Sequence, residues 1–488
     1  MTATGDIVAK LWNLCHVLRD GGISYQQYVT ELTLLLFLKM EEEVAATRRP
    51  PKTRLPEKLR WTDLENAPPG GQQLDHYKRM LLDLGKASDP LVRAIYTGAQ
   101  TSLREARHLS RLVVDIDALD WFTAKQDGLG DLYEGLLEKN AGEIKSGAGQ
   151  YFTPRPLIDA MVEVMRPQPG EVIQDPAAGT GGFLIAADTY IKRHTDDLFD
   201  LDERAQEFQR KQAFVGLELV PETRRLALMN CMLHDIEGTG DGPVRLGDSL
   251  TGEGAKLLGK ANVILSNPPF GTKKGAGGGS RDDLTFQTSN KQLMFLQHIY
   301  KALVAGGRAA VVLPDNVLFE EGRGREIRAD LMDKCDLHTI LRLPTGIFYA
   351  QGVKTNVLFF TRGRTEKGNT KQVWVYDLRT NAPAFGKRTP FTRAYLQPFV
   401  DAYGPDPLGT SPRKDEGETG RFRAFSRADI ARRNDNLDIT WLKDDDAHDE
   451  STLGDPAELA ATIRTELEAA LADLASLEDL LGSTSAGA

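Results

Sequence analysis

Cysteine is rare in this sequence and is not arranged as a disulfide framework or a zinc site requires. Its three copies, Cys15, Cys231 and Cys335, lie far apart among 488 residues, and no C-x-x-C pair occurs. The eight histidines show no H-x-x-x-H spacing or other ligand cluster. These absences predict that the protein uses no catalytic metal and that its cysteines are structural.

Long apolar runs are also missing. The strongest run, Leu32 to Leu38, is far shorter than the roughly 20 residues that a membrane-spanning helix needs. The N-terminus lacks the basic and then apolar pattern of a secretory signal. We therefore expect a cytoplasmic protein that does not enter a membrane.

The chain has no excess of positive charge, since its formal net charge is −10 and its pI is near 5.5. A protein that grips DNA alone through phosphate contacts is usually basic. Acidity does not exclude work on DNA, because charge can be local. It does indicate that a partner supplies much of any affinity for DNA.

The length predicts about three folded units, at about 100–200 residues for each. The first unit, residues 1–140, is expected to be helical and shows no alternating strand pattern. A linker with three glycines follows at 138–149. The apolar spacing predicts helices at Ile7–Leu18, Tyr28–Met40, Leu91–Ile95 and Gly130–Leu137.

The second unit, residues 141–440, alternates short β-branched runs with helical segments. This alternation predicts an α/β fold, with a Rossmann-like, mainly parallel sheet covered by helices on both faces. The expected strands are Val172–Ile173, Ala213–Gly216, a third strand before Asp248, Ala261–Leu265, Arg308–Leu313, Leu337–Arg342, Val357–Thr361 and Lys371–Asp377. From about Gly363 the remaining pattern is polar and irregular.

The last unit, residues 441–488, is expected to be an acidic linker and a C-terminal helical tail. Leucines and an isoleucine recur three or four apart between Leu459 and Leu481 and form one apolar stripe. The stripe packs either on its own domain or against the helix of a partner, as in coiled-coil pairing.

A strand, a glycine-rich turn and a helix follow one another from Val172 to Tyr190, which is the order of a nucleotide-type site. Its glycines allow the backbone to approach a ligand closely, although a tight corner without a ligand is the alternative. The spacing is not G-x-G-x-x-G and no G-K-[ST] occurs, which argues against NAD and ATP. The candidate cofactor residues here are Asp175, Ala177, Gly179, Thr180, Gly181, Gly182 and Phe183.

Two further acids follow the next strands. Glu218, at the end of the second strand, is the candidate partner for ribose hydroxyls, but its distance from Asp175 is about twice the usual interval of roughly 20 residues. The charged segment from His194 to Gln212 accounts for the excess as a longer helix or an insertion. Asp248 is either a contact to the adenine amino group of the cofactor or a turn residue.

The strand Ala261–Leu265 runs into Asn267, Pro268, Pro269 and Phe270, the candidate catalytic residues. Two prolines make a stiff corner at the carboxyl end of a strand, where open sheets bind ligands. The side-chain oxygen of Asn267 and the carbonyl of Pro268 would accept the two hydrogens of an exocyclic base amine. The amine lone pair would then point at a sulfonium methyl group, and the Phe270 ring would stack on a base extruded from the duplex.

Taken together, these motifs resemble the modification (M) subunits of type I restriction–modification systems, which are N6-adenine DNA methyltransferases. Gln150 to Arg155 is similar to the family's methionine-end cofactor motif, and its place ahead of the glycine turn resembles the γ class. The resemblance implies that Gln150, Tyr151, Phe152 and Thr153 bind cofactor. Asn290–Leu293, Pro314–Asn316 and Lys354–Val357 resemble later family segments.

The resemblance implies S-adenosylmethionine as cofactor and adenine in duplex DNA as substrate. It also implies assembly of two M subunits with one specificity (S) subunit, optionally with restriction (R) subunits. The S subunit would read the DNA sequence, which fits the acidic charge of this chain. The N-terminal helical region and the final helix are the expected contact surfaces.

Two other functions stay open at this point. A protein-glutamine N5-methyltransferase would also use an Asn-Pro-Pro-aromatic corner, and a non-catalytic assembly subunit would keep the fold without the reaction. The glycine-rich stretch from Gly271 to Arg281 is either a disordered surface loop or an element that closes over the flipped base.

Overall fold

The structure is a computed structural model and describes residues 7–13, 25–47, 53–119, 121, 133–137, 153–271, 281–348, 353–386, 389–443 and 464. The expected linker at 138–149 lies outside these ranges. So does the expected final helix, apart from Arg464. In the described residues, no helix is both long enough and apolar enough to cross a membrane.

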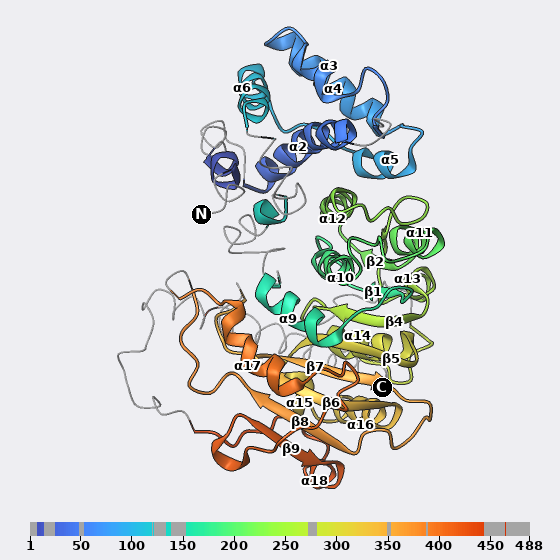
Figure 1. Cartoon of the computed structure of the whole chain (residues 1–488), viewed down its shortest axis with the longest axis vertical. Helices are drawn as coiled ribbons and strands as arrows, with labels where there is room; N and C mark the ends of the chain where they lie inside the picture. The colour runs from blue at the N-terminus through green and yellow to red at the C-terminus, as the bar shows by residue number, and fades with distance from the viewer. Residues whose placement is uncertain are drawn as a thin grey trace, which may run out of the picture.

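The N-terminal region is helical, as predicted (Figure 1). The Asp89 carboxylate begins one of these helices by accepting the Leu91 and Val92 amides, and Pro90 occupies the first turn, where no amide donor is needed. The helices of this region are α2 (Tyr25–Thr47), α3 (Trp61–Glu65), α4 (Gly71–Leu84), α5 (Pro90–Tyr96) and α6 (Ala106–Asp117), and residues 7–13 and 133–137 are also helical.

Nine strands of the described residues form one mixed, mainly parallel sheet in the order β3-β2-β1-β4-β5-β7-β6-β8-β9. Strand β7 is antiparallel to both of its neighbours, and β9 is antiparallel to β8. The strands are β1 (Ile173–Asp175), β2 (Phe214–Glu218), β3 (Val244–Leu246), β4 (Ala261–Ser266), β5 (Leu303–Pro314), β6 (Cys335–Arg342), β7 (Thr355–Arg362), β8 (Gln372–Asp377) and β9 (Phe422–Ser426).

Helices cover both faces of the sheet because side chains alternate along each strand. In β4, Val263 and Leu265 pack in one apolar core, whereas Ile264 packs in the other. The first core includes α9 (Arg155–Met165), α10 (Gly182–Arg193), α12 (Pro221–Leu233) and α17 (Arg393–Tyr403). The second includes α14 (Lys291–Ala302), α15 (Asn316–Phe319), α16 (Arg323–Lys334) and α18 (Arg427–Arg432).

Two segments refine the sequence expectation. The charged stretch after α10 contains a turn and a separate helix, α11 (Glu203–Lys211), which begins at Asp202 and lengthens the path to β2. A short helix, α13 (Gly252–Leu258), joins β3 to β4. The region beyond Gly363, whose pattern was irregular, adds α17, β9 and α18 to the sheet domain.

The order in which the chain adds strands reverses between β1 and β4. Strand β1 has β2 on one side and β4 on the other, both parallel to it. From β1 the chain continues to β2 on one side, and from β4 it continues to β5 on the other side. Open α/β sheets bind ligands at the carboxyl ends of strands at such a switch point. Asp175 ends β1 and Asn267 directly follows β4, so both lie at this edge.

The N-terminal helices pack on the sheet domain through α12, which contacts α2 and α5 (Figure 1). Arg225 of α12 donates hydrogen bonds to the carbonyls of Ile95 (2.6 Å) and Thr97 (3.0 Å), at the end of α5. The apolar core is continuous across this junction. The helical region is therefore held against the domain that carries the predicted site.

Candidate functional site

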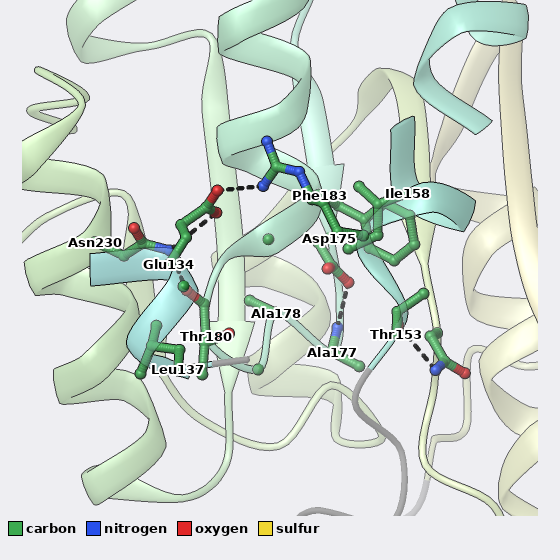
Figure 2. A pocket seen from close by; sticks show the side chains of 15 residues that line it. Glu134, Leu137, Thr153, Ile158, Asp175, Ala177, Ala178, Thr180, Phe183 and Asn230 are labelled. Atoms are coloured by element: carbon green, nitrogen blue, oxygen red, sulfur yellow. Dashed lines mark hydrogen bonds and ion pairs between the residues drawn. The ribbon is translucent and has the colours of Figure 1, made fainter. Parts of the chain in front are cut away.

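A cavity of about 290 Å³ opens beside the glycine turn, at the switch point of the sheet (Figure 2). Gly179 and Gly181 have φ of +54° and +86°, a backbone conformation that side chains with a Cβ rarely adopt. Gly181 lies at the N-terminal end of α10, where backbone amides are available to a ligand. The predicted residues that line the cavity are Thr153, Asp175, Ala177, Gly179, Thr180, Gly182, Phe183 and Asn267.

Asp175 is a buried carboxyl group in the cavity wall. One of its oxygens, Oδ1, accepts hydrogen bonds from the Ser266 hydroxyl (2.7 Å) and the Ala177 amide (3.0 Å; Figure 2). Burial raises the pKa of Asp175 to about 7, because the ionised form loses its hydration. The group can therefore change charge near neutral pH.

Glu218 ends β2 next to the glycine turn but is not among the residues that line the cavity. Its two oxygens accept hydrogen bonds from the amides of Gly179 (3.0 Å) and Val220 (2.9 Å). Burial raises the pKa of this carboxyl group. Asp248 also lies outside the cavity wall, where its side chain accepts the Leu250 amide (2.8 Å). The ribose and adenine roles of these two acids stay predictions.

Asn267 joins the cavity to the segment that precedes the glycine turn. Its amide Nδ2 donates a hydrogen bond to the Thr153 hydroxyl (3.0 Å), and both side chains are buried. This bond fixes the orientation of the Asn267 amide. The structure thus brings together Thr153, Asn267 and the glycine turn, which are far apart in the sequence.

The other residues of the predicted catalytic tetrapeptide follow Asn267 but do not line the cavity. Pro268 is buried, whereas Pro269 and Phe270 are half-buried. Phe270 is therefore partly accessible beside the cavity rather than inside it. The predicted cofactor residues Gln150, Tyr151 and Phe152 lie outside the described residues.

Three polar residues of the cavity wall were not among the predicted site residues: Glu134, Arg155 and Asn230. The Glu134 carboxylate pairs with the Arg155 guanidinium, and the Asn230 amide lies 3.5 Å from the other Glu134 oxygen (Figure 2). Asn230 also donates to the Thr180 carbonyl of the glycine turn (3.1 Å). Glu134 lies on the helical segment 133–137, before the expected linker, so the wall draws on residues from both sides of that linker.

Two later family-like segments meet at the same edge of the sheet. Asp315, directly after β5, binds the Arg379 guanidinium through both oxygens (2.7 and 2.8 Å). It also accepts a hydrogen bond from the Asn356 amide of β7 (2.8 Å). This half-buried pair ties the end of β5 and the start of β7 to the chain after β8, and it supports the carboxyl edge without lining the cavity.

Comparison with known families assigns most of the chain. The N-6 DNA Methylase family matches residues 124–450, and the HsdM N-terminal domain family matches residues 7–116. The first match contains all the described residues that line the cavity.

Two curated relatives align along nearly their whole length. The chain is 53% identical to the type I restriction enzyme EcoKI methylase subunit of Escherichia coli strain K12, over 98% of this chain and 96% of the relative. It is 31% identical to the type I restriction enzyme EcoEI methylase subunit of Escherichia coli, over 96% of each chain.

Solved structures agree with this assignment. The crystal structure of the EcoKI M protein matches with a TM-score of 0.58 and 49% identity, over 98% of this chain and 96% of that chain. A modification subunit of a type I restriction enzyme from Vibrio vulnificus matches with a TM-score of 0.70 and 25% identity, over 88% and 94%. With an N6-methyltransferase domain behind a helical N-terminal region, the chain belongs to the family of type I restriction–modification methylase subunits.

Proposed function

We propose that this chain transfers a methyl group from S-adenosylmethionine to N6 of an adenine extruded from duplex DNA, at sites chosen by a separate specificity subunit. The observation that carries the proposal is the placement of Asn267. Its amide, oriented by Thr153, lies in the wall of the same cavity as the glycine turn. A methyl acceptor held by Asn267 would therefore adjoin a cofactor bound in this cavity.

The cavity fits an elongated cofactor that has an amino-acid end and a nucleoside end. The glycine turn and the start of α10 offer backbone amides, while Asp175 and the Glu134–Arg155 pair offer charges of both signs. A zwitterionic amino-acid group needs such a mixed lining. S-adenosylmethionine would supply an electrophilic methyl group on its sulfonium.

The tetrapeptide would act by positioning the acceptor. The Asn267 side-chain oxygen and the Pro268 carbonyl would each accept one hydrogen of the adenine amine, which favours a tetrahedral nitrogen with its lone pair exposed. The half-buried Phe270 ring would stack on the extruded base, a contact worth about 1–3 kcal/mol in other base–aromatic pairs. Holding the two reactants in line is the main contribution, and no strong general base is required.

The proposed division of labour includes partners. The net charge of −10 gives this chain little general attraction to DNA, so a specificity subunit would supply most of the grip and the sequence recognition. We propose an assembly of two copies of this chain with one specificity subunit, optionally with restriction subunits. One solved structure that matches with a TM-score of 0.70 comes from work on complex assembly of the type I restriction–modification system.

The test is methylome sequencing of cells that express this chain with or without the neighbouring specificity subunit. We expect N6-methyladenine at one defined sequence when both proteins are present, and no such modification with the Asn267→Ala chain. Methyl incorporation into protein instead of DNA would support the glutamine methyltransferase. Absence of methyl transfer to either class would support a non-catalytic assembly subunit.

A further inference from the structure

We infer that Gln292, at the start of α14, is a positioning residue that holds the catalytic tetrapeptide through the backbone of Gly271. This inference rests on the proposed function, because it assigns a role within the methyl-transfer site. Gln292 does not line the cavity, and its side-chain amide bonds to Gly271 and Asn290. Its role is therefore distinct from binding the cofactor.

The Gln292 side-chain amide makes a two-point contact with Gly271. In the amide orientation that gives each polar atom a complementary partner, Oε1 accepts the Gly271 N–H (2.8 Å) and Nε2 donates to the Gly271 carbonyl (3.1 Å) and to Asn290 Oδ1. The Lys291 amide also donates to the Gly271 carbonyl (3.1 Å). Gln292 is buried, at 5% exposed, whereas Gly271 lies at the surface, so the contact links a buried side chain of α14 to an exposed turn.

The bond to Gly271 N–H matters for Phe270 because the two share one planar peptide unit. Fixing the direction of this N–H fixes the Phe270 carbonyl and so the backbone torsion ψ of Phe270. Gly271 itself has a φ of +113°, so the chain turns sharply directly after the aromatic ring. A clamp on Gly271 therefore limits where the Phe270 ring can lie.

Helix α14 also holds the chain after residue 280, again through a two-point contact of a glutamine side chain with a backbone peptide group. Gln297 accepts the Phe286 N–H and donates to the Phe286 carbonyl, both at 2.9 Å. His298 Nδ1 contacts the buried Arg281 guanidinium (3.1 Å), which also donates to the Ser249 carbonyl. Helix α14 thus anchors the described residues on both sides, and of the two glutamines Gln292 is the one next to the tetrapeptide.

The two glutamines form a matched pair for an experiment. Gln292→Met and Gln297→Met each remove a two-point contact made by a buried side-chain amide of one helix, and each keeps a side chain of similar length. The full chain would be assembled with the specificity subunit, and methyl transfer would be measured on a duplex that carries the site found by methylome sequencing. Cofactor affinity, thermal unfolding and the fluorescence of 2-aminopurine at the target base would be measured on the same samples.

We expect Gln292→Met to lower kcat about 10- to 100-fold, as a displacement of about 1 Å in a reacting group does, with cofactor affinity unchanged. The emission of 2-aminopurine in the complex should also change, because stacking on Phe270 is altered. Gln297→Met should lower the unfolding temperature by a similar amount but keep kcat within about threefold of wild type. Gln292→Glu, which keeps the acceptor for Gly271 N–H, should recover part of the lost rate.

Equal losses of kcat in both methionine variants, or an unchanged kcat in Gln292→Met, would overturn the positioning role. If Gln292→Met does not fold, the Gln292→Glu variant decides in the same way, by its kcat relative to Gln297→Glu. A wild-type assembly that transfers no methyl group to DNA would instead refute the proposed function, so the two failures are distinguishable.

Discussion

At the scale of single residues, one hydrogen bond joins two motifs that the sequence separates by 114 positions, Thr153 and Asn267. A buried amide must satisfy its polar atoms within the protein, so its orientation is set by the partner it finds. Here the Thr153 hydroxyl accepts the hydrogen bond that the Asn267 amide nitrogen donates. Thr153 therefore has a second expected role beside cofactor contact, because it determines which end of Asn267 is presented to an acceptor base.

Replacing Asn267 with alanine should abolish methylation and spare cofactor binding, because the change removes an acceptor for the base amine and leaves the glycine turn intact. We expect kcat to fall at least about 100-fold, with the dissociation constant of S-adenosylmethionine unchanged. Asn262 in β4 is a suitable control, since its side chain accepts the Val172 amide (2.9 Å) away from the cavity. Full activity of Asn267→Ala would refute the mechanism.

Asp175 predicts a pH dependence of cofactor affinity. Burial raises the pKa of this carboxyl group to about 7, so a neutral group predominates in the free protein below that pH. A cationic cofactor favours the ionised form and lowers the pKa in the complex. Affinity should therefore increase as the pH rises toward about 7 and become level above it, as calorimetry across this range would show.

Asp175→Asn should flatten this profile, and its amide oxygen can still accept the bonds from Ser266 and Ala177, both of which end on Oδ1. Asp188 on α10 provides the control, because burial raises its pKa to about 6 and it does not line the cavity. If Asp188→Asn flattens the profile and Asp175→Asn does not, Asp175 is not the titrating group.

At the scale of elements, the sequence pattern predicted the strands that carry the site because their signals are local. The run Ala261–Leu265 is apolar and ends at two prolines, and the structure ends β4 at Ser266. Strand β9 was not predicted. Its residues alternate weakly, and it is stabilised by pairing with β8, a contact of sequence-distant segments.

The polar wall of the cavity was harder to predict for the same reason. Glu134, Arg155 and Asn230 come from a helical stretch before the linker, from α9 and from α12. Each has an ordinary charged or polar helical context in the sequence. Only folding brings the three side chains together, so the local pattern gave no signal beyond the proximity of Arg155 to the upstream motif.

Glu134→Ala should weaken the binding of S-adenosylmethionine about 10-fold, because it removes an anionic group from the wall and leaves Arg155 with Asp159 as its remaining carboxylate partner. Equilibrium binding of labelled cofactor measures the effect. Glu163→Ala is the matched control. Glu163 lies on α9, the helix of Arg155, and pairs with Arg393 of α17, but it does not line the cavity. Equal weakening by both variants would show that a general loss of stability is responsible.

At the scale of the whole molecule, the net charge of −10 favours the proposal that this chain catalyses the reaction and a partner recognises the DNA. We expect the purified chain alone to bind S-adenosylmethionine but to methylate a specific duplex poorly. Addition of the specificity subunit should restore the rate and make it strongly dependent on salt concentration, because that subunit would add phosphate contacts. Efficient sequence-specific methylation by the chain alone would contradict this division.

The cavity wall has one more consequence, because it is built from both sides of the linker. Glu134 lies on the helical segment 133–137, before the expected linker, and the glycine turn belongs to the sheet domain after it. If docking of the two regions increases the affinity for the cofactor by some factor, bound cofactor must favour docking by the same factor, since such coupling is reciprocal. The methyl donor would then also be a structural effector. Without bound cofactor, the interface between Arg225 and the end of α5 would open more readily.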